Sequence, residues 1–161
     1  MSAKRGEHLI RLCGVAILFA STALCGLAVE PPSPASYGIR MENTWIPMKD
    51  GVRLSATLYM PDKANAGEKF PAILEYQPYR KDDAMAARDY GIYSYFARRG
   101  YVCARVDIRG FGNSEGVPPD REYSEQEQED GMQVIAWLAR QPWSNGNVGM
   151  MGISWSGFNS L

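Results

Sequence analysis

The sequence VGMMGISWSG, residues 148–157, places a serine among small residues at the end of an apolar run. The apolar part is typical of a buried strand, and Gly152, Ser156 and Gly157 then surround Ser154. Small residues on both sides of a serine allow a strand to turn sharply into a helix, with the hydroxyl raised above the sheet. The pattern therefore predicts a nucleophile elbow with Ser154 as the nucleophile.

The residue after the serine, Trp155, begins the expected helix. Its backbone N–H can therefore point toward the oxygen of a carbonyl group that the serine attacks. A serine in a glycine-rich turn from strand to helix also occurs without any catalytic role, so the motif alone leaves both interpretations open. The elements upstream favour one of them.

The first of these elements is an expected antiparallel hairpin between residues 39 and 61. Lys49, Asp50 and Gly51 form its turn, and residues 52–60 alternate apolar with polar side chains. Alternation of this kind around Asp-Gly is typical of a hairpin with one buried face.

The pattern then changes to short apolar runs over 70–74, 101–106 and 148–151, which are typical of strands buried on both faces. Helices are expected over 92–99 and 126–140, the second opened by Ser124 and Glu127 as a capping box. This order predicts an α/β fold, with a mostly parallel sheet and an antiparallel hairpin at its start.

Four stretches carry a resemblance to a known family: MKDGVRLSATLYMP (48–61), QPYRK (77–81), DIRGFGNSEG (107–116) and QPWSNGNVGMMGISWSG (141–157). In order and spacing they resemble the Xaa-Pro dipeptidyl-peptidase and cocaine-esterase group of α/β-hydrolases. The likeness covers most of the chain from Trp45 onward. It implies the amino-terminal part of an α/β-hydrolase catalytic domain, over residues 39–161, with an incomplete sheet.

The resemblance also implies roles for three residues. Ser154 would be the nucleophile, the Trp155 N–H would be one oxyanion donor, and the hydroxyl of Tyr79 would be the second. A phenol suits this task because its pKa of about 10 keeps it a neutral donor at neutral pH. Without the family, Tyr79 is only an aromatic residue in a loop after a strand.

A glycine-rich loop after a strand is typical of a dinucleotide site, but the stretch 107–116 does not match that fingerprint. Glu115 stands where the third glycine should be. In the related family this loop is structural, so Asp107 and Arg109 are expected to hold loop backbone and to take no part in the chemistry.

A serine hydroxyl needs a base, and in this fold the chain order is Ser, then Asp or Glu, then His. The residues after Ser154 include neither an acid nor a histidine, and the single histidine is His8. We therefore expect the acid and the histidine to lie outside these 161 residues, in a longer chain truncated here after the elbow. We expect the fragment alone to be inactive.

Basic residues near the amino terminus precede an apolar run over 12–28, which predicts a signal peptide cleaved after Ala28 and a secreted or periplasmic protein. An uncleaved membrane anchor is the alternative, because about 17 apolar residues can just span a bilayer. Residues 29–38 are rich in proline and predict an extended linker. Cys103 follows this leader in an apolar strand, so core packing is expected.

The composition excludes several functions. A net charge of −1 without a basic cluster gives no site for nucleic acid, and no His or Cys residues cluster at metal-ligand spacing. No cofactor is implied, and a membrane would be a partner only through an uncleaved leader. The expected substrate is a small ester, amide or peptide, with ester, β-lactam acyl and Xaa-Pro dipeptidyl groups left open. A non-catalytic secreted binding module with this fold is the alternative function.

Overall fold

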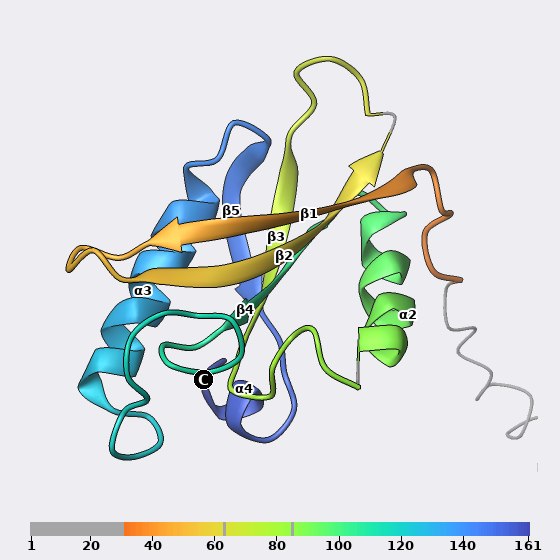
Figure 1. Ribbon diagram of the computed structural model, residues 1–161. Coiled ribbons are helices and arrows are strands. Elements are labelled where there is room, and N and C mark those ends of the chain that lie inside the picture. The colour runs from red at the N-terminus through yellow and green to blue at the C-terminus, as the bar shows by residue number, and fades with distance from the viewer. Residues whose placement is uncertain (1–30, 63, 85) are drawn as a thin grey trace, which may run out of the picture. The chain divides into compact units, whose positions relative to one another are not determined.

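A computed structural model describes residues 31–62, 64–84 and 86–161 of the chain (Figure 1). The predicted leader and its cleavage site after Ala28 lie outside these residues. Within them, no helix has the length and apolar character needed to cross a membrane. The strands and helices described below all belong to one compact unit, Pro34–Leu161.

Five strands in the described part of the chain form one sheet in the order β1-β2-β4-β3-β5. Their bounds are β1 Gly38–Pro47, β2 Arg53–Asp62, β3 Phe70–Gln77, β4 Val102–Asp107 and β5 Ser144–Met150. β1 pairs with β2, and β2 with β4, in antiparallel fashion, whereas β3 pairs with both β4 and β5 in parallel. The sheet thus confirms the predicted α/β fold, with an antiparallel hairpin leading into parallel strands.

The hairpin turn forms where Asp-Gly predicts it. Gly51 has φ +88°, a conformation that side chains with a Cβ rarely adopt. The Met48 N–H donates to the Val52 carbonyl at 2.8 Å, and the Gly51 N–H donates to the Met48 carbonyl at 3.0 Å. This turn sets the register that pairs Ile46 with Leu54 in the core.

Strand β2 is buried on both faces, so the prediction of one buried face was wrong. Ser55, Thr57 and Tyr59 are no more than 6% exposed, like the apolar residues between them. β2 lies inside the sheet, between β1 and β4, and a helix covers its second face. Its polar groups are paired there, since the Thr57 hydroxyl donates to the Asn43 side-chain oxygen at 2.7 Å.

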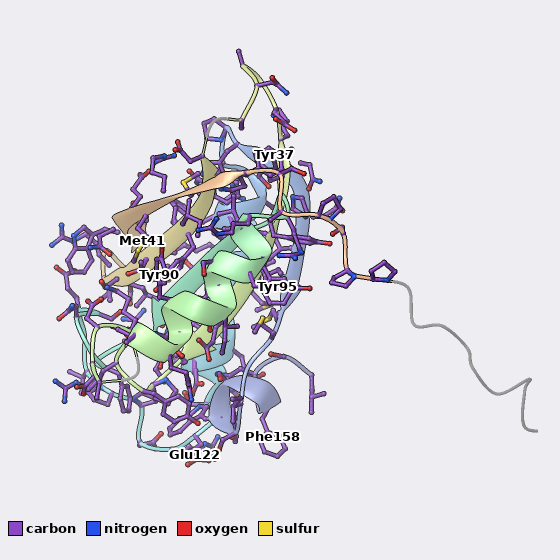
Figure 2. The ribbon with its side chains drawn as sticks, turned by 90° about the vertical axis from the view of Figure 1, so that its right-hand side faces the viewer. Tyr37, Met41, Tyr90, Tyr95, Glu122 and Phe158 are labelled. Atoms are coloured by element: carbon purple, nitrogen blue, oxygen red, sulfur yellow. The ribbon has the colours of Figure 1, made fainter. Side chains whose placement is uncertain are left out.

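Helices α2 (Ala86–Ala97) and α3 (Glu125–Ala139) cover opposite faces of the sheet (Figure 1). On one face, Tyr93 of α2 packs with Cys103 of β4, and on the other, Val134 and Leu138 of α3 join the larger core. Cys103 is fully buried as predicted, and burial raises the pKa of its thiol to about 12. Figure 2 shows α2 in front of the sheet, with the ribbon turned by 90°.

Helix α2 begins at Ala86, six residues before the predicted start. The prediction missed its first turns because they carry few large apolar residues that could signal a helix. Helix α3 matches its prediction closely, and the Ser124 side chain accepts from the Glu127 N–H at 3.2 Å. The second half of the predicted capping box differs, because the Glu127 carboxylate accepts from the Tyr123 N–H instead of the Ser124 N–H.

Strand β5 was predicted to be buried on both faces, and this was wrong for the described residues. β5 lies at the edge of the sheet, where Asn147 and Gly149 are exposed and Val148 and Met150 are only partly buried. The carboxyl ends of the parallel strands β3, β4 and β5 nevertheless lie at the same end of the sheet, where α/β folds commonly bind ligands. The segments that follow Gln77, Asp107 and Met150 therefore meet there (Figure 1).

Candidate active site

The chain turns sharply after β5, as the sequence predicts. Ser154 has φ +55° and ψ −121°, and the short helix α4 (Trp155–Phe158) follows at once. A positive φ at a residue with a Cβ costs about 1 to 3 kcal/mol and persists only where the surrounding structure holds it. Ser154 is exposed, and its side chain makes no capping hydrogen bond with α4. Its hydroxyl is therefore accessible to a substrate.

Small residues around Ser154 make this turn possible. Ser156 is fully buried, and its Oγ accepts from the Ile153 N–H at 3.0 Å. The same hydroxyl lies 3.0 Å from the Ile153 carbonyl and 3.4 Å from Glu75 Oε1, either of which can accept its proton. A Cβ on Gly152 would lie only 2.4 Å from Ser156 Oγ and 2.5 Å from the Ser156 carbonyl carbon. The elbow thus requires glycine at position 152.

We expect Gly152→Ala to destabilise the protein by about 1 to 3 kcal/mol, because the added Cβ overlaps backbone that has no room to move. Gly149→Ala is the matched control, since Gly149 lies in β5 just before the elbow and a Cβ there meets nothing within 4 Å. Urea unfolding, followed by circular dichroism, measures both changes. Equal stability of the two variants would contradict the close contact at the elbow.

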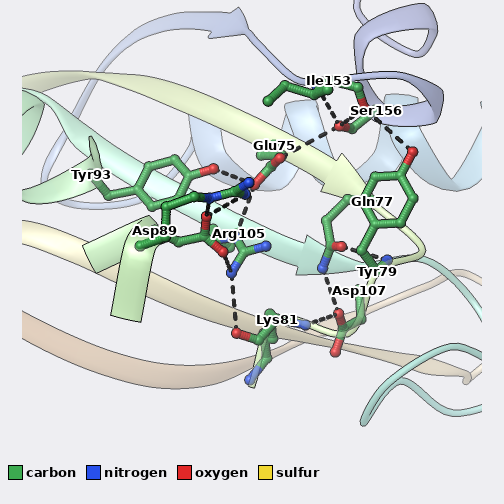
Figure 3. Close-up of polar contacts among 11 residues, drawn as sticks. Glu75, Gln77, Tyr79, Lys81, Asp89, Tyr93, Arg105, Asp107, Ile153 and Ser156 are labelled. Carbon is green, nitrogen blue, oxygen red and sulfur yellow. Dashed lines mark hydrogen bonds and ion pairs between the residues drawn. The ribbon is translucent and has the colours of Figure 1, made fainter. Parts of the chain in front are cut away.

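Tyr79 lies in the loop after β3, and its hydroxyl reaches the elbow (Figure 3). The Trp155 N–H donates to Tyr79 Oη at 2.8 Å, although the two residues are 76 positions apart in the sequence. Tyr79 Oη in turn donates to the Ile153 carbonyl at 3.3 Å. The structure therefore brings together the three residues singled out from the sequence, with two hydrogen-bond donors beside the serine turn.

A buried carboxylate holds the loop that carries Tyr79. Asp107 Oδ1 accepts from Gln77 Nε2 and from the Lys81 N–H, both at 2.7 Å, and Oδ2 accepts from the Asn113 N–H at 3.1 Å. Burial is the main cause of the raised pKa of Asp107, and these backbone donors partly offset it. Asp107 thus fixes two loops at the edge of the site, as predicted (Figure 3).

Arg109 also acts on backbone position. Its Nε and Nη2 donate to the two carboxylate oxygens of Asp130 at 2.7 and 2.9 Å, and its Nη1 lies 2.7 Å from Asp50 Oδ2. The hydrogen bond with Asp130 is the main cause of the raised pKa of the Arg109 guanidinium. Arg109 therefore ties the 107–116 loop to α3 and to the hairpin turn, which agrees with the prediction that it holds loop backbone.

The sequence analysis missed a buried ionic network beneath the elbow (Figure 3). Arg105 Nε donates to Glu75 Oε2 at 2.8 Å, and Arg105 Nη1 lies 2.6 Å from Asp89 Oδ2. The Tyr93 hydroxyl also donates to Glu75. Opposite charges in two apolar strands were the available signal, since Glu75 of β3 pairs directly with Arg105 of β4. The parallel register was needed to recognise it.

The described residues offer no histidine as a base for Ser154 and no cluster of metal ligands. They contain no histidine, and they bring together no group of three or more His, Cys, Asp or Glu side chains that could hold a metal ion. The arrangement supplies an exposed hydroxyl on a strained turn and two N–H or O–H groups beside it. These groups suit attack on a carbonyl carbon, with donors for the negative charge that develops on its oxygen.

A family model described as X-Pro dipeptidyl-peptidase (S15 family) matches residues 50–161. The cocaine esterase of Rhodococcus sp. (strain MB1 Bresler) is 38% identical over 116 residues, which cover 71% of this chain and 19% of that enzyme. The chain spans about a fifth of the length of the curated relatives it matches.

Solved structures show the same relationship. A hydrolase of the CocE/NonD family from Staphylococcus aureus superimposes with a TM-score of 0.64 at 31% identity, over 75% of this chain and 24% of that one. An α-amino acid ester hydrolase gives a TM-score of 0.59 at 28% identity, over 84% of this chain and 25% of that one. The matched parts share a portion of the α/β-hydrolase fold.

Proposed function

The chain belongs to the X-Pro dipeptidyl-peptidase (S15) family, and from that premise we propose that the protein is a serine hydrolase acting through Ser154. The reaction is transfer of an acyl group from an ester or amide to water. The observation that carries the proposal is the 2.8 Å contact between the Trp155 N–H and Tyr79 Oη beside the Ser154 turn. This contact supports the proposal because it brings a backbone N–H and a side-chain hydroxyl together beside the serine.

In the first step, Ser154 Oγ forms a bond to the substrate carbonyl carbon while its proton passes to a base. The carbonyl oxygen becomes an oxyanion, which accepts hydrogen bonds from the Trp155 N–H and from the Tyr79 hydroxyl. Collapse of this intermediate breaks the bond to the alcohol or amine, which leaves with a proton, and forms an acyl-enzyme. Water then attacks the ester and restores Ser154. Under this proposal the histidine base and its carboxylate partner lie outside these 161 residues.

The Tyr79 hydroxyl can donate a hydrogen bond to the oxyanion without large movement of the side chain. In the free protein its hydroxyl donates to the Ile153 carbonyl at 3.3 Å, which is a long hydrogen bond. A hydrogen bond to an oxyanion is charge-assisted and stronger, so the proton is expected to turn toward the intermediate as it forms. Replacing the hydrogen bond to Ile153 by one to the oxyanion stabilises the transition state more than the bound substrate, and this difference accelerates the reaction.

Substrate class follows from the relatives only as a proposal. Relatives named for cocaine ester, α-amino acid esters and X-Pro dipeptides share this part of the fold. All three substrates present a carbonyl carbon to a nucleophile, and the acyl group differs among them. We therefore propose an ester or an Xaa-Pro peptide as the substrate.

A fluorophosphonate, which reacts with activated serines, tests the proposed nucleophile. We expect mass spectrometry of the full-length gene product to find the label on the peptide that contains Ser154. Protein unfolded in urea is the control and should not react. The 161-residue chain by itself should also remain unlabelled, because its single histidine, His8, precedes the domain. A full-length protein that hydrolyses para-nitrophenyl esters but carries the label elsewhere would refute the assignment.

A further inference from the structure

Three residues donate hydrogen bonds to one buried carboxylate, that of Glu127 on α3. Trp155 Nε1 and Asn159 Nδ2 donate to Glu127 Oε1 at 2.7 and 2.8 Å. The Tyr123 N–H donates to the other oxygen at 3.1 Å. Glu127 is only 2% exposed. Two of its three partners belong to the segment that follows Ser154.

Trp155 is held at two points, one on its indole and one on its backbone. Its Nε1 donates to Glu127, while the backbone N–H of the same residue donates to Tyr79 Oη. Aromatic rings enclose the indole between these points, with ring centroids 6.1 Å away for Phe111 and 5.7 Å away for Tyr123. Rotation of the indole is therefore restricted by packing, and its position along the site is set by the hydrogen bond to Glu127.

Helix capping accounts for only one contact of the Glu127 carboxylate, the hydrogen bond from the Tyr123 N–H. Ser124 already caps α3, since its side chain accepts from the Glu127 N–H. None of the ion pairs in the described part of the chain includes Glu127. A buried carboxylate without a cation is costly unless hydrogen-bond donors compensate for it. Here both compensating side-chain donors, Trp155 and Asn159, come from α4 and the residue that ends it.

We infer that Glu127 is a positioning residue for the proposed reaction: by fixing the Trp155 indole, it orients the Trp155 backbone N–H toward the oxyanion. The inference rests on the proposed function. The peptide between Ser154 and Trp155 carries this N–H, and Ser154 occupies a strained conformation that its surroundings must hold. A small change in the direction of an oxyanion donor weakens its hydrogen bond in the transition state more than it weakens substrate binding.

Three variants of the full-length protein separate the contacts of Glu127. Glu127→Ala removes all three hydrogen bonds. Glu127→Gln keeps one carbonyl oxygen for Trp155 and Asn159, but it presents an amide N–H₂ to the Tyr123 N–H. Trp155→Phe keeps an aromatic ring in the enclosure and removes the Nε1–H group together with part of the indole. Glu129→Ala is the control, because Glu129 is an exposed glutamate on the same helix.

For hydrolysis of a para-nitrophenyl ester, we expect Glu127→Ala and Trp155→Phe each to lower kcat by about tenfold, with KM changed less than about twofold. The double variant should also lose about tenfold, and not about a hundredfold, since both changes break the same hydrogen bond. Glu127→Gln should recover most of kcat, and Glu129→Ala should match the parent. A purely structural role for Glu127 would not produce this combination of a kcat effect, rescue and non-additivity.

Several outcomes would overturn the inference. A hundredfold loss in the double variant would show that the two residues act independently, and an unchanged kcat in Trp155→Phe would show that the Nε1 contact has no effect on the reaction. If Glu127→Ala does not fold, Glu127→Gln and Trp155→Phe still decide the matter. Fluorophosphonate labelling distinguishes a failure of the role of Glu127 from a failure of the proposed function. Label on Ser154 together with unchanged kcat in Trp155→Phe would refute the role of Glu127 alone, whereas absence of label on Ser154 in the active parent would refute the proposed function.

Discussion

Ser154→Ala is expected to lower kcat of the full-length protein for ester hydrolysis by about 10⁶-fold, the loss seen when a serine hydrolase loses its nucleophile. Without Ser154 Oγ no acyl-enzyme can form, and water must attack the substrate directly. The oxyanion donors remain in this variant, so a residual rate of about 10³ to 10⁴ over the uncatalysed reaction is expected to persist. Steady-state hydrolysis of a para-nitrophenyl ester measures this loss.

The fold should tolerate this change. The Ser154 side chain is exposed and makes no capping hydrogen bond, so its removal breaks no contact that holds the elbow. The melting temperature of Ser154→Ala should therefore match that of the parent. Ser36→Ala, at an exposed serine before β1, is the control for activity. Retention of more than about 1% of parental kcat in Ser154→Ala would show that another residue is the nucleophile.

The sequence predicted the features that depend on neighbours along the chain. Asp-Gly at positions 50 and 51 predicted the hairpin turn, because positive φ at glycine is a local requirement. The small residues around Ser154 predicted the elbow for a similar reason, since the contact between Gly152 and Ser156 spans only four positions. Sterics of this range can be read directly from sequence.

Features that depend on contacts across the sheet were harder to predict. The alternation in β2 indicated one exposed face, but Ser55 and Thr57 are buried as well, because β2 lies inside the sheet and contacts other segments on both faces. The ion pair between Glu75 and Arg105 requires the parallel register of two strands whose connection includes a helix. No local pattern contains that register.

The candidate site divides in the same way. Ser154 and Trp155 follow from a local motif, whereas Tyr79 came from family resemblance. Its contact with Trp155 joins the segments that follow two neighbouring parallel strands, β3 and β5. Glu127 was predicted only as part of a helix cap. Its contact with the Trp155 indole depends on how α3 and α4 lie over the same face of the sheet, which only the folded structure provides.

Tyr79→Phe tests the oxyanion donor that is farthest from the serine in sequence. We expect kcat to fall by about 10² to 10³, with little change in KM, because the hydroxyl interacts more strongly with the oxyanion than with the bound ester. The phenyl ring keeps its place in the loop, and the Tyr79 side chain is 43% exposed, so its lost hydrogen bonds should cost little stability. Tyr90→Phe is the matched control, at an exposed tyrosine on α2 (Figure 2).

A double variant is needed to interpret the effect of Tyr79→Phe on kcat. Tyr79 Oη also accepts from the Trp155 N–H, so its loss could act by freeing that N–H to move instead of by removing a donor. Tyr79→Phe combined with Trp155→Phe distinguishes the two effects, because Trp155→Phe keeps the backbone N–H and the Tyr79 hydroxyl and alters the side-chain contacts that orient the N–H. Losses that multiply would show that the Tyr79 hydroxyl contributes its own hydrogen bond to the oxyanion. A double variant no slower than Tyr79→Phe alone would show that Tyr79 acts by holding the Trp155 N–H, and it would remove Tyr79 from the set of oxyanion donors.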